Sequence, residues 1–220
     1  MKPLLIAHRG DTVNFSENSM DAFQSAFEKG ADGIELDVHF QNGNLIVVHD
    51  YLFDRNKLYP LLPQVLELFS KRGRIEMEIK AMDLDFIPHL KQLLSKYAGS
   101  DFEITTSVFP LVFYLRKEFP MISIGVIFHD KDFEEWMTDE FIQLKVLQFM
   151  RLFKANVAHI PWKIVNKNIV DSCHQNGFKI HSHIYKQNLD IQMKIYKKME
   201  NFGIDQCSID DILLLDMLKK

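Results

Sequence analysis

We expect an α/β fold of the (β/α)8 TIM barrel class from three features of this chain of 220 residues. Apolar strand-like runs alternate with amphipathic helix-like segments from one end to the other, which favours a parallel sheet. The strand-like runs number eight, and eight such units need about 200 to 250 residues. Titratable residues end several of these runs, where a barrel places its active site. A doubly wound sheet with fewer strands is the structural alternative.

The expected elements follow from the spacing of apolar residues. The strands are Leu4 to His8, Gly33 to Phe40, Arg74 to Lys80, Phe102 to Ser107, Ile122 to Phe128, Asn156 to Pro161, Phe178 to Tyr185 and Gln206 to Ile209. The helices are Glu17 to Lys29, Leu62 to Lys71, Asp85 to Tyr97, Leu111 to Glu118, Phe133 to Phe153, Lys167 to Gln175, Leu189 to Asn201 and Asp210 to Lys219. Glu17 and Asn18 open the first helix, where we expect them to cap it and to support Arg9.

An added β-hairpin is expected after the second strand. Residues 41–44 are rich in Asn and Gly, which tolerate positive φ angles. A two-residue loop at residues 42–43 would pair His49 with Leu36, on the face opposite the carboxylates of that strand. A three-residue loop would pair His49 with Asp37 on the same face. The chemistry described below requires the second register, or a bulge with the same effect.

Composition indicates one globular domain. Hydrophobic residues make up 47% of the chain, which is enough to bury a large core. No repeat, linker or low-complexity segment divides it, so we expect a single domain over residues 1–220. The formal net charge is -4, and Lys and Arg residues are spread along the chain. We therefore expect no nucleic acid partner.

Hydropathy and cysteine usage indicate the compartment. No apolar stretch approaches the roughly 18 to 20 residues that span a bilayer. The segment from Met1 to Ala7 is too short for a secretory signal, so we expect a cytoplasmic protein without a transmembrane segment. Cys173 and Cys207 lack a metal-binding spacing and are expected to be buried free thiols. The sequence predicts no particular oligomeric state.

Candidate site residues end the strand-like runs near the start of the chain. His8 and His49 each follow a run of four apolar residues, and Glu35 and Asp37 lie within the second expected strand. Alternate residues of a strand point to the same face, so these two carboxylates share a face. Charged and titratable groups at strand ends are typical of the catalytic rim of a barrel.

Another expected strand repeats this geometry. Glu78 and Lys80 are two residues apart and share a face, and Glu76 lies on that face as well. From the residues alone, either glutamate could belong to a site formed with Glu35 and Asp37.

Five motifs in one order resemble the glycerophosphodiester phosphodiesterase family. They are His8-Arg9-Gly10, Glu17-Asn18-Ser19, the run from Gly30 to Val38, Val47-Val48-His49-Asp50 and Glu76-Met77-Glu78-Ile79-Lys80. The match is dense over residues 4–50 and clear again at residues 75–80. The resemblance implies a (β/α)8 barrel and the metal-dependent hydrolysis of a glycerophosphodiester to glycerol 3-phosphate and an alcohol.

The resemblance also implies a divalent cation bound by Glu35, Asp37 and Glu78. Three carboxylates without a thiol or imidazole ligand suit Mg²⁺ or Ca²⁺ better than Zn²⁺. Likeness to the Glu-Ile-Lys ending of the family motif favours Glu78 over Glu76 as the ligand.

By the same resemblance, His8 and His49 are the general acid and base, and Arg9 and Lys80 bind the phosphate oxygens. Imidazole suits both proton transfers, because its ordinary pKa of about 6.5 lies near neutral pH. The sequence does not say which histidine is the acid. Either water attacks phosphorus directly, or a neighbouring substrate hydroxyl first forms a cyclic phosphate, the route that the family likeness favours.

The chain departs from the family pattern in a much shortened insertion. Only Tyr51 to Tyr59 separate the His-Asp motif from the next expected helix, where the family has a sizeable segment that covers the pocket. His183 also stands where the family often has Trp. An alternative function is therefore a related phosphodiesterase for lysophospholipids or another phosphodiester. A non-catalytic barrel that binds an anion is a third possibility, disfavoured because it would not need two histidines beside three carboxylates.

Overall fold

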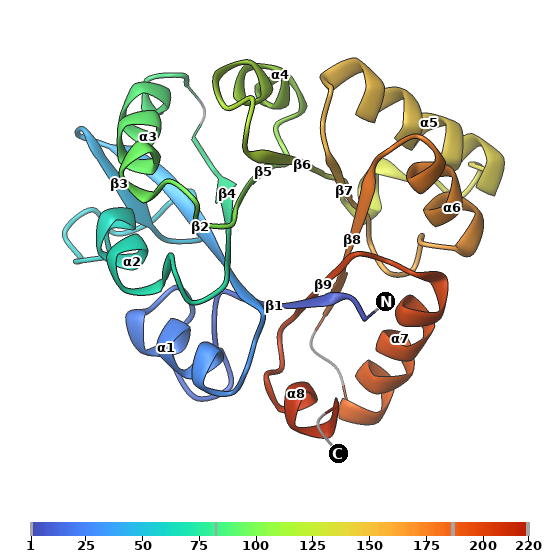
Figure 1. The fold of residues 1–220 in the computed structure, drawn as a ribbon, viewed down its shortest axis with the longest axis horizontal. Helices are drawn as coiled ribbons and strands as arrows, with labels where there is room; N and C mark the ends of the chain where they lie inside the picture. The colour runs from blue at the N-terminus through green and yellow to red at the C-terminus, as the bar shows by residue number, and fades with distance from the viewer. Residues whose placement is uncertain (1, 82, 186–187, 219–220) are drawn as a thin grey trace. The chain divides into compact units, whose positions relative to one another are not determined.

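The computed structural model describes residues 2–81, 83–185 and 188–218 (Figure 1). Its strands are β1 (Leu4–His8), β2 (Gly33–Gln41), β3 (Asn44–Val47), β4 (Arg74–Ile79), β5 (Phe102–Thr106), β6 (Ser123–Ile127), β7 (Val157–His159), β8 (Lys179–Ile184) and β9 (Gln206–Ile209). Its α-helices are α1 (Met20–Glu28), α2 (Leu62–Phe69), α3 (Phe86–Leu94), α4 (Phe109–Glu118), α5 (Asp139–Phe153), α6 (Lys167–Gln175), α7 (Leu189–Phe202) and α8 (Leu213–Leu218). Short 3₁₀ helices are η1 (Ser95–Tyr97) and η2 (Asp130–Asp132).

These strands form a single sheet in the order β1-β9-β8-β7-β6-β5-β4-β2-β3, and β1 also pairs with β2. The second pairing of β1 closes the sheet, while β3 is attached outside the closed ring as the partner of β2. Strands and helices alternate along the chain as expected. The prediction of a (β/α)8 barrel with an added hairpin is therefore confirmed.

The chain divides into two compact units. The first unit comprises Ile6–Ile104 and Asp210–Lys220, and the second comprises Met1–Leu5 and Thr105–Ile209. Every candidate site residue named above from the family resemblance lies in the first unit. Organisation as one domain over residues 1–220 stays a prediction.

Alternation along β2 and β4 separates the core of the first unit from its acidic face. The two strands pair in parallel, with Ile34 beside Ile75 and Leu36 beside Met77, and all four side chains are fully buried. Helix α1 packs against β2 and also contacts α2. Because successive side chains of a strand point to opposite faces, this apolar row forces the residues between its members onto the other face.

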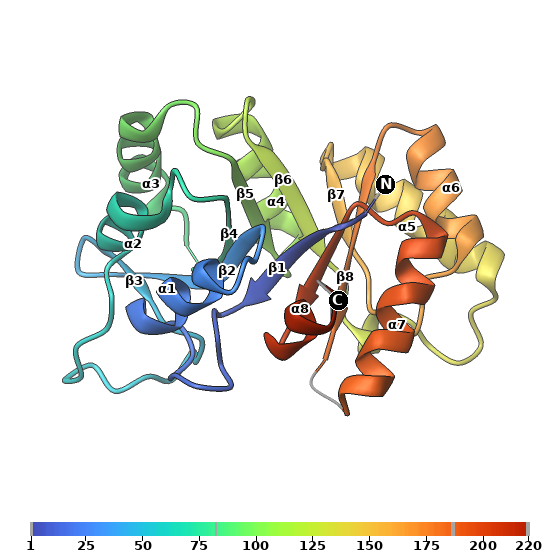
Figure 2. The same ribbon diagram turned by 60° about the horizontal axis from the view of Figure 1, so that its bottom comes forward.

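The hairpin has the two-residue loop at residues 42–43. Asn42 and Gly43 have φ angles of 50° and 78°, and Gln41 pairs with Asn44 at the end of the ladder. The three-residue register that we expected the chemistry to require is therefore wrong. The strand β3 ends at Val47, so His49 lies beyond the ladder and its direction is not set by strand alternation. Figure 2 shows β3 on the outer side of the first unit, with α2 and α3 against it.

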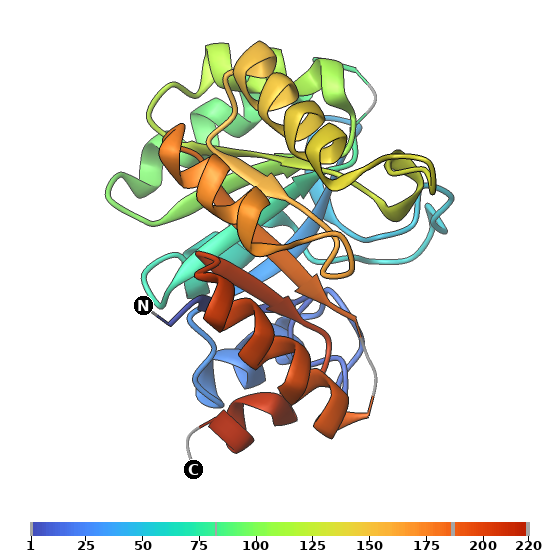
Figure 3. The ribbon, with the colours of Figure 1, turned by 90° about the vertical axis from the view of Figure 1, so that its right-hand side faces the viewer.

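In the second unit, β6, β7, β8 and β9 pair in parallel. Figure 3 shows α5, α6 and α7 on one side of these strands. Phenylalanine rings fill the interface between α4 and α5, where the ring of Phe109 lies 5.1 Å from that of Phe149 and 6.3 Å from that of Phe153. This packing leaves Phe109 half-buried at the edge of the core.

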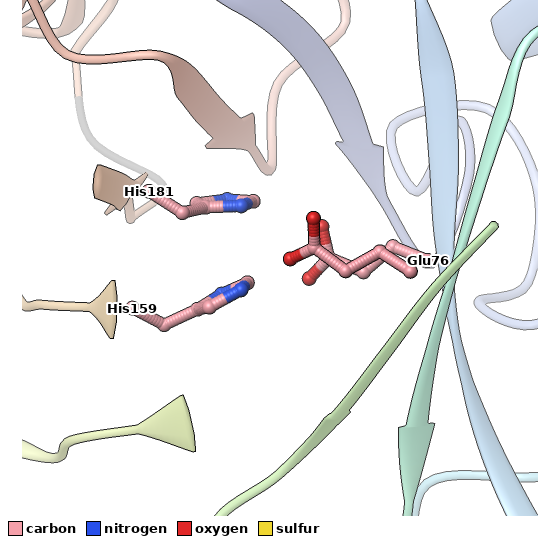
Figure 4. Close-up of side chains that lie close together, drawn as sticks. Glu76, His159 and His181 are labelled. Carbon is pink, nitrogen blue, oxygen red and sulfur yellow. The ribbon is translucent and has the colours of Figure 1, made fainter. Parts of the chain in front are cut away.

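The same unit contains two buried histidines. His159 and His181 occupy partner positions on β7 and β8, and their rings stack with centroids 4.1 Å apart (Figure 4). Nε2 of His181 lies 2.6 Å from the hydroxyl oxygen of Ser208. Gly125 leaves room for this pair, because a Cβ atom there would lie 2.7 Å from Nε2 of His159.

Several helices begin or end away from their expected limits, and two of them show the physical reason. The helix expected from Phe133 begins at Asp139, because Thr138 has extended backbone angles and its side chain accepts a hydrogen bond from Phe141 N. The helix expected over residues 210–219 begins at Leu213, after a turn in which Asp211 accepts a hydrogen bond from Leu213 N. The last residue of the expected range, Lys219, lies outside the described part of the chain.

Two expectations drawn from composition concern the thiols and the membrane. Cys173 and Cys207 are both buried and free, as expected. Among the helices of the described residues, none combines the length and apolar character needed to cross a membrane.

Replacing Gly10 by Ala should destabilise the protein more than replacing Gly43 by Ala. Both glycines have positive φ, but a Cβ at Gly10 would lie 2.7 Å from the backbone of Ala22, whereas nothing lies within 4 Å of one at Gly43. We expect Gly10→Ala to lower the free energy of unfolding by about 3 kcal/mol and Gly43→Ala by about 1 kcal/mol, measured by urea denaturation. Equal losses would contradict the steric argument.

Candidate active site

Strand register places acidic residues side by side in two rows on one face of the first unit. Glu35 pairs with His8 on one side and with Glu76 on the other, which forms the first row. Two residues further along, Asp37 pairs with Glu78 and forms the second row. The rows follow directly from the alternation that buries the apolar residues of β2 and β4 on the opposite face.

Three of these carboxylates form a compact cluster. Glu35, Asp37 and Glu78 each offer an oxygen atom, and these atoms all lie within 4.8 Å of one another. The three side chains are buried, and Asp37 has no exposed surface. The structure thus brings together the three residues that the family resemblance implied as metal ligands. Glu76 pairs with Glu35 in the first row and is not part of this cluster.

Burial and the repulsion of neighbouring carboxylates raise the pKa of Glu35 well above its usual range. Burial is the largest cause, and the negative charges of Asp37, Glu78 and Glu76 add to it, while Arg9 opposes it. Oε1 of Glu35 is buried and has no hydrogen-bond partner among the described residues. This oxygen therefore lacks the compensation that a buried carboxylate normally has.

Asp37 is compensated, so its pKa moves in the opposite direction. Burial would raise its pKa, but the positive charges of Lys80 and Arg9 and a hydrogen bond from Asn18 outweigh burial and lower it. Nζ of Lys80 lies 3.2 Å from Oδ1 of Asp37 and 2.8 Å from Oε1 of Glu78. Lys80 is itself buried, which places its ammonium group beside the carboxylate cluster rather than in solvent.

Arg9 reaches the cluster through an unusual backbone conformation. Its φ angle is 58°, in the left-handed region, and Gly10 follows it with a φ angle of 85°. The backbone N–H of Arg9 donates to the carbonyl oxygen of Glu35 at 3.0 Å, and its side chain lies 3.1 Å from Oδ2 of Asp37. Glu17 accepts a hydrogen bond from the guanidinium at 2.9 Å, so the expected support of Arg9 by Glu17 is present.

The two histidines lie in different surroundings. Nε2 of His8 is 3.8 Å from Oε2 of Glu35, and its Nδ1 is 2.7 Å from Oδ1 of Asp210. Nδ1 of His49 pairs with its neighbour in sequence, Asp50, at 3.1 Å. His49 is close enough to the cluster for its charge to lower the pKa of Asp37. Both histidines thus lie near the carboxylates.

Three residues near the cluster were not assigned to it from sequence. Asn18, at a φ angle of 57°, donates from its side chain to Oδ2 of Asp37 at 2.8 Å instead of capping α1, a role that falls to Ser19. His39 shares the face of Asp37 and is buried between the rings of Tyr51 and Phe53. Asp210 pairs with His8 from the far end of the chain.

Each missed residue carried a weak signal. Asn18 belongs to one of the family motifs, His39 continues the alternation of Glu35 and Asp37, and Asp210 follows the end of a strand.

The shortened insertion lies over part of this site. Residues 50–60 contain turns and bends without a helix or strand, and Ile46 bridges to Leu61 where the segment ends. The ring of Tyr51 faces Nζ of Lys80 at 5.9 Å from its centroid, and Leu52 is 98% exposed. The segment therefore covers the lysine with one aromatic ring and presents apolar surface to solvent.

The cluster fits a divalent cation. Three carboxylates face two cationic side chains, so the site carries one excess negative charge when all three are ionised. A dication would bind the oxygen of Glu35 that lacks a partner and would remove the repulsion that raises its pKa. Oxygen ligands of this kind suit hard cations.

Comparison with known proteins identifies the family. A model of the glycerophosphoryl diester phosphodiesterase family matches residues 8–205. The chain belongs to this family. It is therefore a phosphoric diester hydrolase of the glycerophosphodiester phosphodiesterase type.

One similar protein covers the whole chain, and another covers about half of it. A glycerophosphodiester phosphodiesterase of Caldanaerobacter subterraneus subsp. tengcongensis is 26% identical over 257 residues, covering 100% of this chain and 99% of that protein. A glycerophosphodiester phosphodiesterase of Bacillus altitudinis is 30% identical over 135 residues, which is 47% of this chain and 51% of that protein.

Solved structures share the fold. The glycerophosphodiester phosphodiesterase of Thermotoga maritima matches with a TM-score of 0.73 at 20% identity, covering 99% of each chain. A phosphodiesterase of Oleispira antarctica, solved in complex with the product sn-glycerol-3-phosphate, matches with a TM-score of 0.81 at 16% identity, covering 100% of this chain and 98% of that one.

Replacing Glu35 by Gln should weaken the pH dependence of stability in EDTA. The folded protein holds more protons on Glu35 than the unfolded chain does, because its pKa is raised. The free energy of unfolding should therefore fall as pH rises from the ordinary glutamate pKa, about 4.3, through the raised one, and Gln removes this loss. Urea denaturation at a series of pH values measures it.

In EDTA above the ordinary glutamate pKa, the Glu35→Gln variant should be more stable than the wild type. With excess Ca²⁺ or Mg²⁺ the wild type should be the more stable of the two, because only the wild type gains stability from the bound ion. Glu67→Gln, on the exposed face of α2, is the matched control and should follow the wild type in both conditions. The idea fails if the Glu35 variant and the wild type show the same pH dependence in EDTA.

Replacing Asn18 by Ala should lower the affinity for a divalent cation by about 10- to 100-fold, as loss of a residue that orients a metal ligand typically does. The side-chain amide holds Oδ2 of Asp37, and its oxygen accepts from the Asp37 backbone at 3.2 Å. Isothermal titration with Ca²⁺ measures the affinity. Asn166→Ala removes the cap of α6 in the second unit and should leave it unchanged. Equal affinities in both variants would contradict this role.

Proposed function

We propose that the protein hydrolyses glycerophosphodiesters to glycerol 3-phosphate and an alcohol, with a divalent cation and with His8 and His49 as the acid and base pair. One observation carries the proposal: three buried carboxylates lie within 4.8 Å of one another, and His8 pairs with one of them across adjacent strands. The family membership supports the reaction class. The product bound to the Oleispira antarctica phosphodiesterase supports the glycerol 3-phosphate end of the substrate.

The cation would be held by Glu35, Asp37 and Glu78. When bound, it would supply positive charge that stabilises the negative charge building up on the phosphate oxygens. Mg²⁺ and Ca²⁺ fit a site made of carboxylate oxygens alone, and the flexible coordination of Ca²⁺ tolerates irregular geometry better. We therefore propose one of these two ions.

The basic residues and histidines perform the remaining steps. Arg9 and Lys80 already contact the carboxylate cluster, and their donors would bind the non-bridging oxygens of a phosphate there. One histidine takes the proton of the attacking hydroxyl as its oxygen bonds to phosphorus. The other gives a proton to the alkoxide as the bond from phosphorus to the leaving oxygen breaks. In the cyclic route a substrate hydroxyl attacks first, and the two histidines exchange roles in the second step: the one that gave its proton takes a proton from water, and the other returns its proton to the substrate oxygen as the cyclic bond breaks.

A lysophospholipid is the second candidate substrate. The segment over Lys80 is short, and Tyr51 and Leu52 are 53% and 98% exposed. These side chains give the rim of the site an apolar surface that could contact an acyl chain.

The proposed function also includes a cytoplasmic location and a role in the turnover of phospholipid products.

Purified protein should release glycerol 3-phosphate from glycerophosphocholine or glycerophosphoglycerol with Mg²⁺, Ca²⁺ or Mn²⁺, and EDTA should abolish the release. A coupled dehydrogenase assay detects the product, and lysophosphatidylcholine in the same assay tests the second candidate. His49→Ala should lose about 10²- to 10⁴-fold in kcat, the usual contribution of a positioned acid or base.

The control is His89→Ala, which removes an exposed histidine packed against Phe40. Absence of turnover with every diester in the presence of all three cations would refute the proposed function.

A further inference from the structure

The ring of His8 is held by a residue from the other end of the chain. Its Nδ1 lies 2.7 Å from Oδ1 of Asp210, although 202 positions separate the two residues. The side chains of His8 and Asp210 are only 19% and 18% exposed, so solvent competes weakly for this contact. A carboxylate accepts hydrogen bonds and donates none, which requires that the hydrogen lies on Nδ1 of His8.

Asp210 is anchored to the loop that follows His8. It comes directly after β9, and its backbone carbonyl accepts a hydrogen bond from the hydroxyl of Thr12 at 2.9 Å. The side chain of Asp210 therefore contacts the last residue of β1, and its backbone contacts the loop that follows. This arrangement fixes the direction of the carboxylate relative to the imidazole.

The other histidine of the pair lacks such support. Nδ1 of His49 lies 3.1 Å from Oδ1 of Asp50, and these side chains are 36% and 75% exposed. Asp50 is the next residue in sequence, and both residues lie beyond the end of β3. A solvent-exposed contact of this kind between adjacent residues orients a ring weakly.

We propose that Asp210 is a positioning residue that makes His8 the proton acceptor of the reaction. The inference rests on the proposed function, in which His8 and His49 form the acid and base pair. With its hydrogen on Nδ1, the neutral ring of His8 presents the lone pair of Nε2, and this atom faces Oε2 of Glu35 at 3.8 Å. Asp210 holds the ring in this tautomer and orientation, as the carboxylate of a catalytic triad does.

The proton balance assigns the partner roles. Nε2 of His8 takes the proton of the attacking hydroxyl while the oxygen forms its bond to phosphorus. The leaving alkoxide receives a proton from His49, whose exposed ring exchanges protons with solvent. His49 is then neutral and His8 is protonated, and both return to their starting states through water.

The first test compares two leaving groups. Asp210→Asn keeps the shape of the side chain but offers an amide, and it should lower kcat by about 10²-fold with little change in KM or Ca²⁺ affinity. The loss should be the same for glycerophosphocholine and for the p-nitrophenyl diester of glycerol 3-phosphate. His49→Ala should lose activity mainly on glycerophosphocholine, because p-nitrophenolate leaves without a proton.

The second test is a double-mutant cycle. If Asp210 acts through His8, Asp210→Asn should cause no further loss in a His8→Ala background. Asp216→Asn, an exposed aspartate on α8, is the matched control and should keep wild-type kcat. The proposal is overturned if the Asp210 variant loses activity only with the poor leaving group, if its effect adds to that of His8→Ala, or if kcat is unchanged.

A measurement without turnover separates this inference from the proposed function. In protein labelled with ¹⁵N-histidine, NMR should show His8 as the Nδ1–H tautomer in the wild type and a mixture of tautomers in Asp210→Asn. If the wild type turns over no diester but the tautomers differ in this way, the proposed function is refuted. The control of the His8 tautomer by Asp210 would still hold. An unchanged tautomer in the variant would refute the positioning role.

Discussion

Glu35, Asp37 and Glu78 repel one another across two hydrogen-bonded strands, and burial removes the water that would otherwise weaken the repulsion. The carboxylates cannot move apart without loss of the core. Ile34 and Leu36 alternate with them on β2, and a shift of one residue in register would turn these apolar side chains to the acidic face. The free energy of the hydrophobic core thus maintains a charge arrangement that is unfavourable by itself.

The surrounding loops supply the compensation. Arg9 and Asn18 both occupy the left-handed region of φ, a conformation that costs a residue other than glycine about 1 to 3 kcal/mol. Each uses it to direct a donor to Asp37. Together with Lys80 they lower the pKa of Asp37, whereas Glu35 keeps a raised pKa and an oxygen without a partner. This asymmetry leaves a place for positive charge beside Glu35.

The two histidines are held in the site in different ways. His8 is held by strand pairing with Glu35 and by a carboxylate from the end of the chain. His49 follows a strand that ends two residues before it, and among the described residues its carboxylate partner is its neighbour Asp50. An imidazole that must keep one tautomer benefits from the first arrangement, and one that exchanges protons with solvent benefits from the second. The difference supports unequal roles within one acid and base pair.

Local patterns in the sequence determined the strands and helices, the face shared by Glu35 and Asp37, and the presence of a turn within residues 41–44, but not its length. These properties depend on apolar spacing and on the backbone freedom of Asn and Gly, which neighbouring residues reveal. Only the tertiary structure decided the pairing of Asp37 with Glu78, the contact of Asn18 with Asp37 and that of Asp210 with His8. Such contacts join residues distant in sequence, and their geometry follows from strand register and loop packing, which no local pattern encodes.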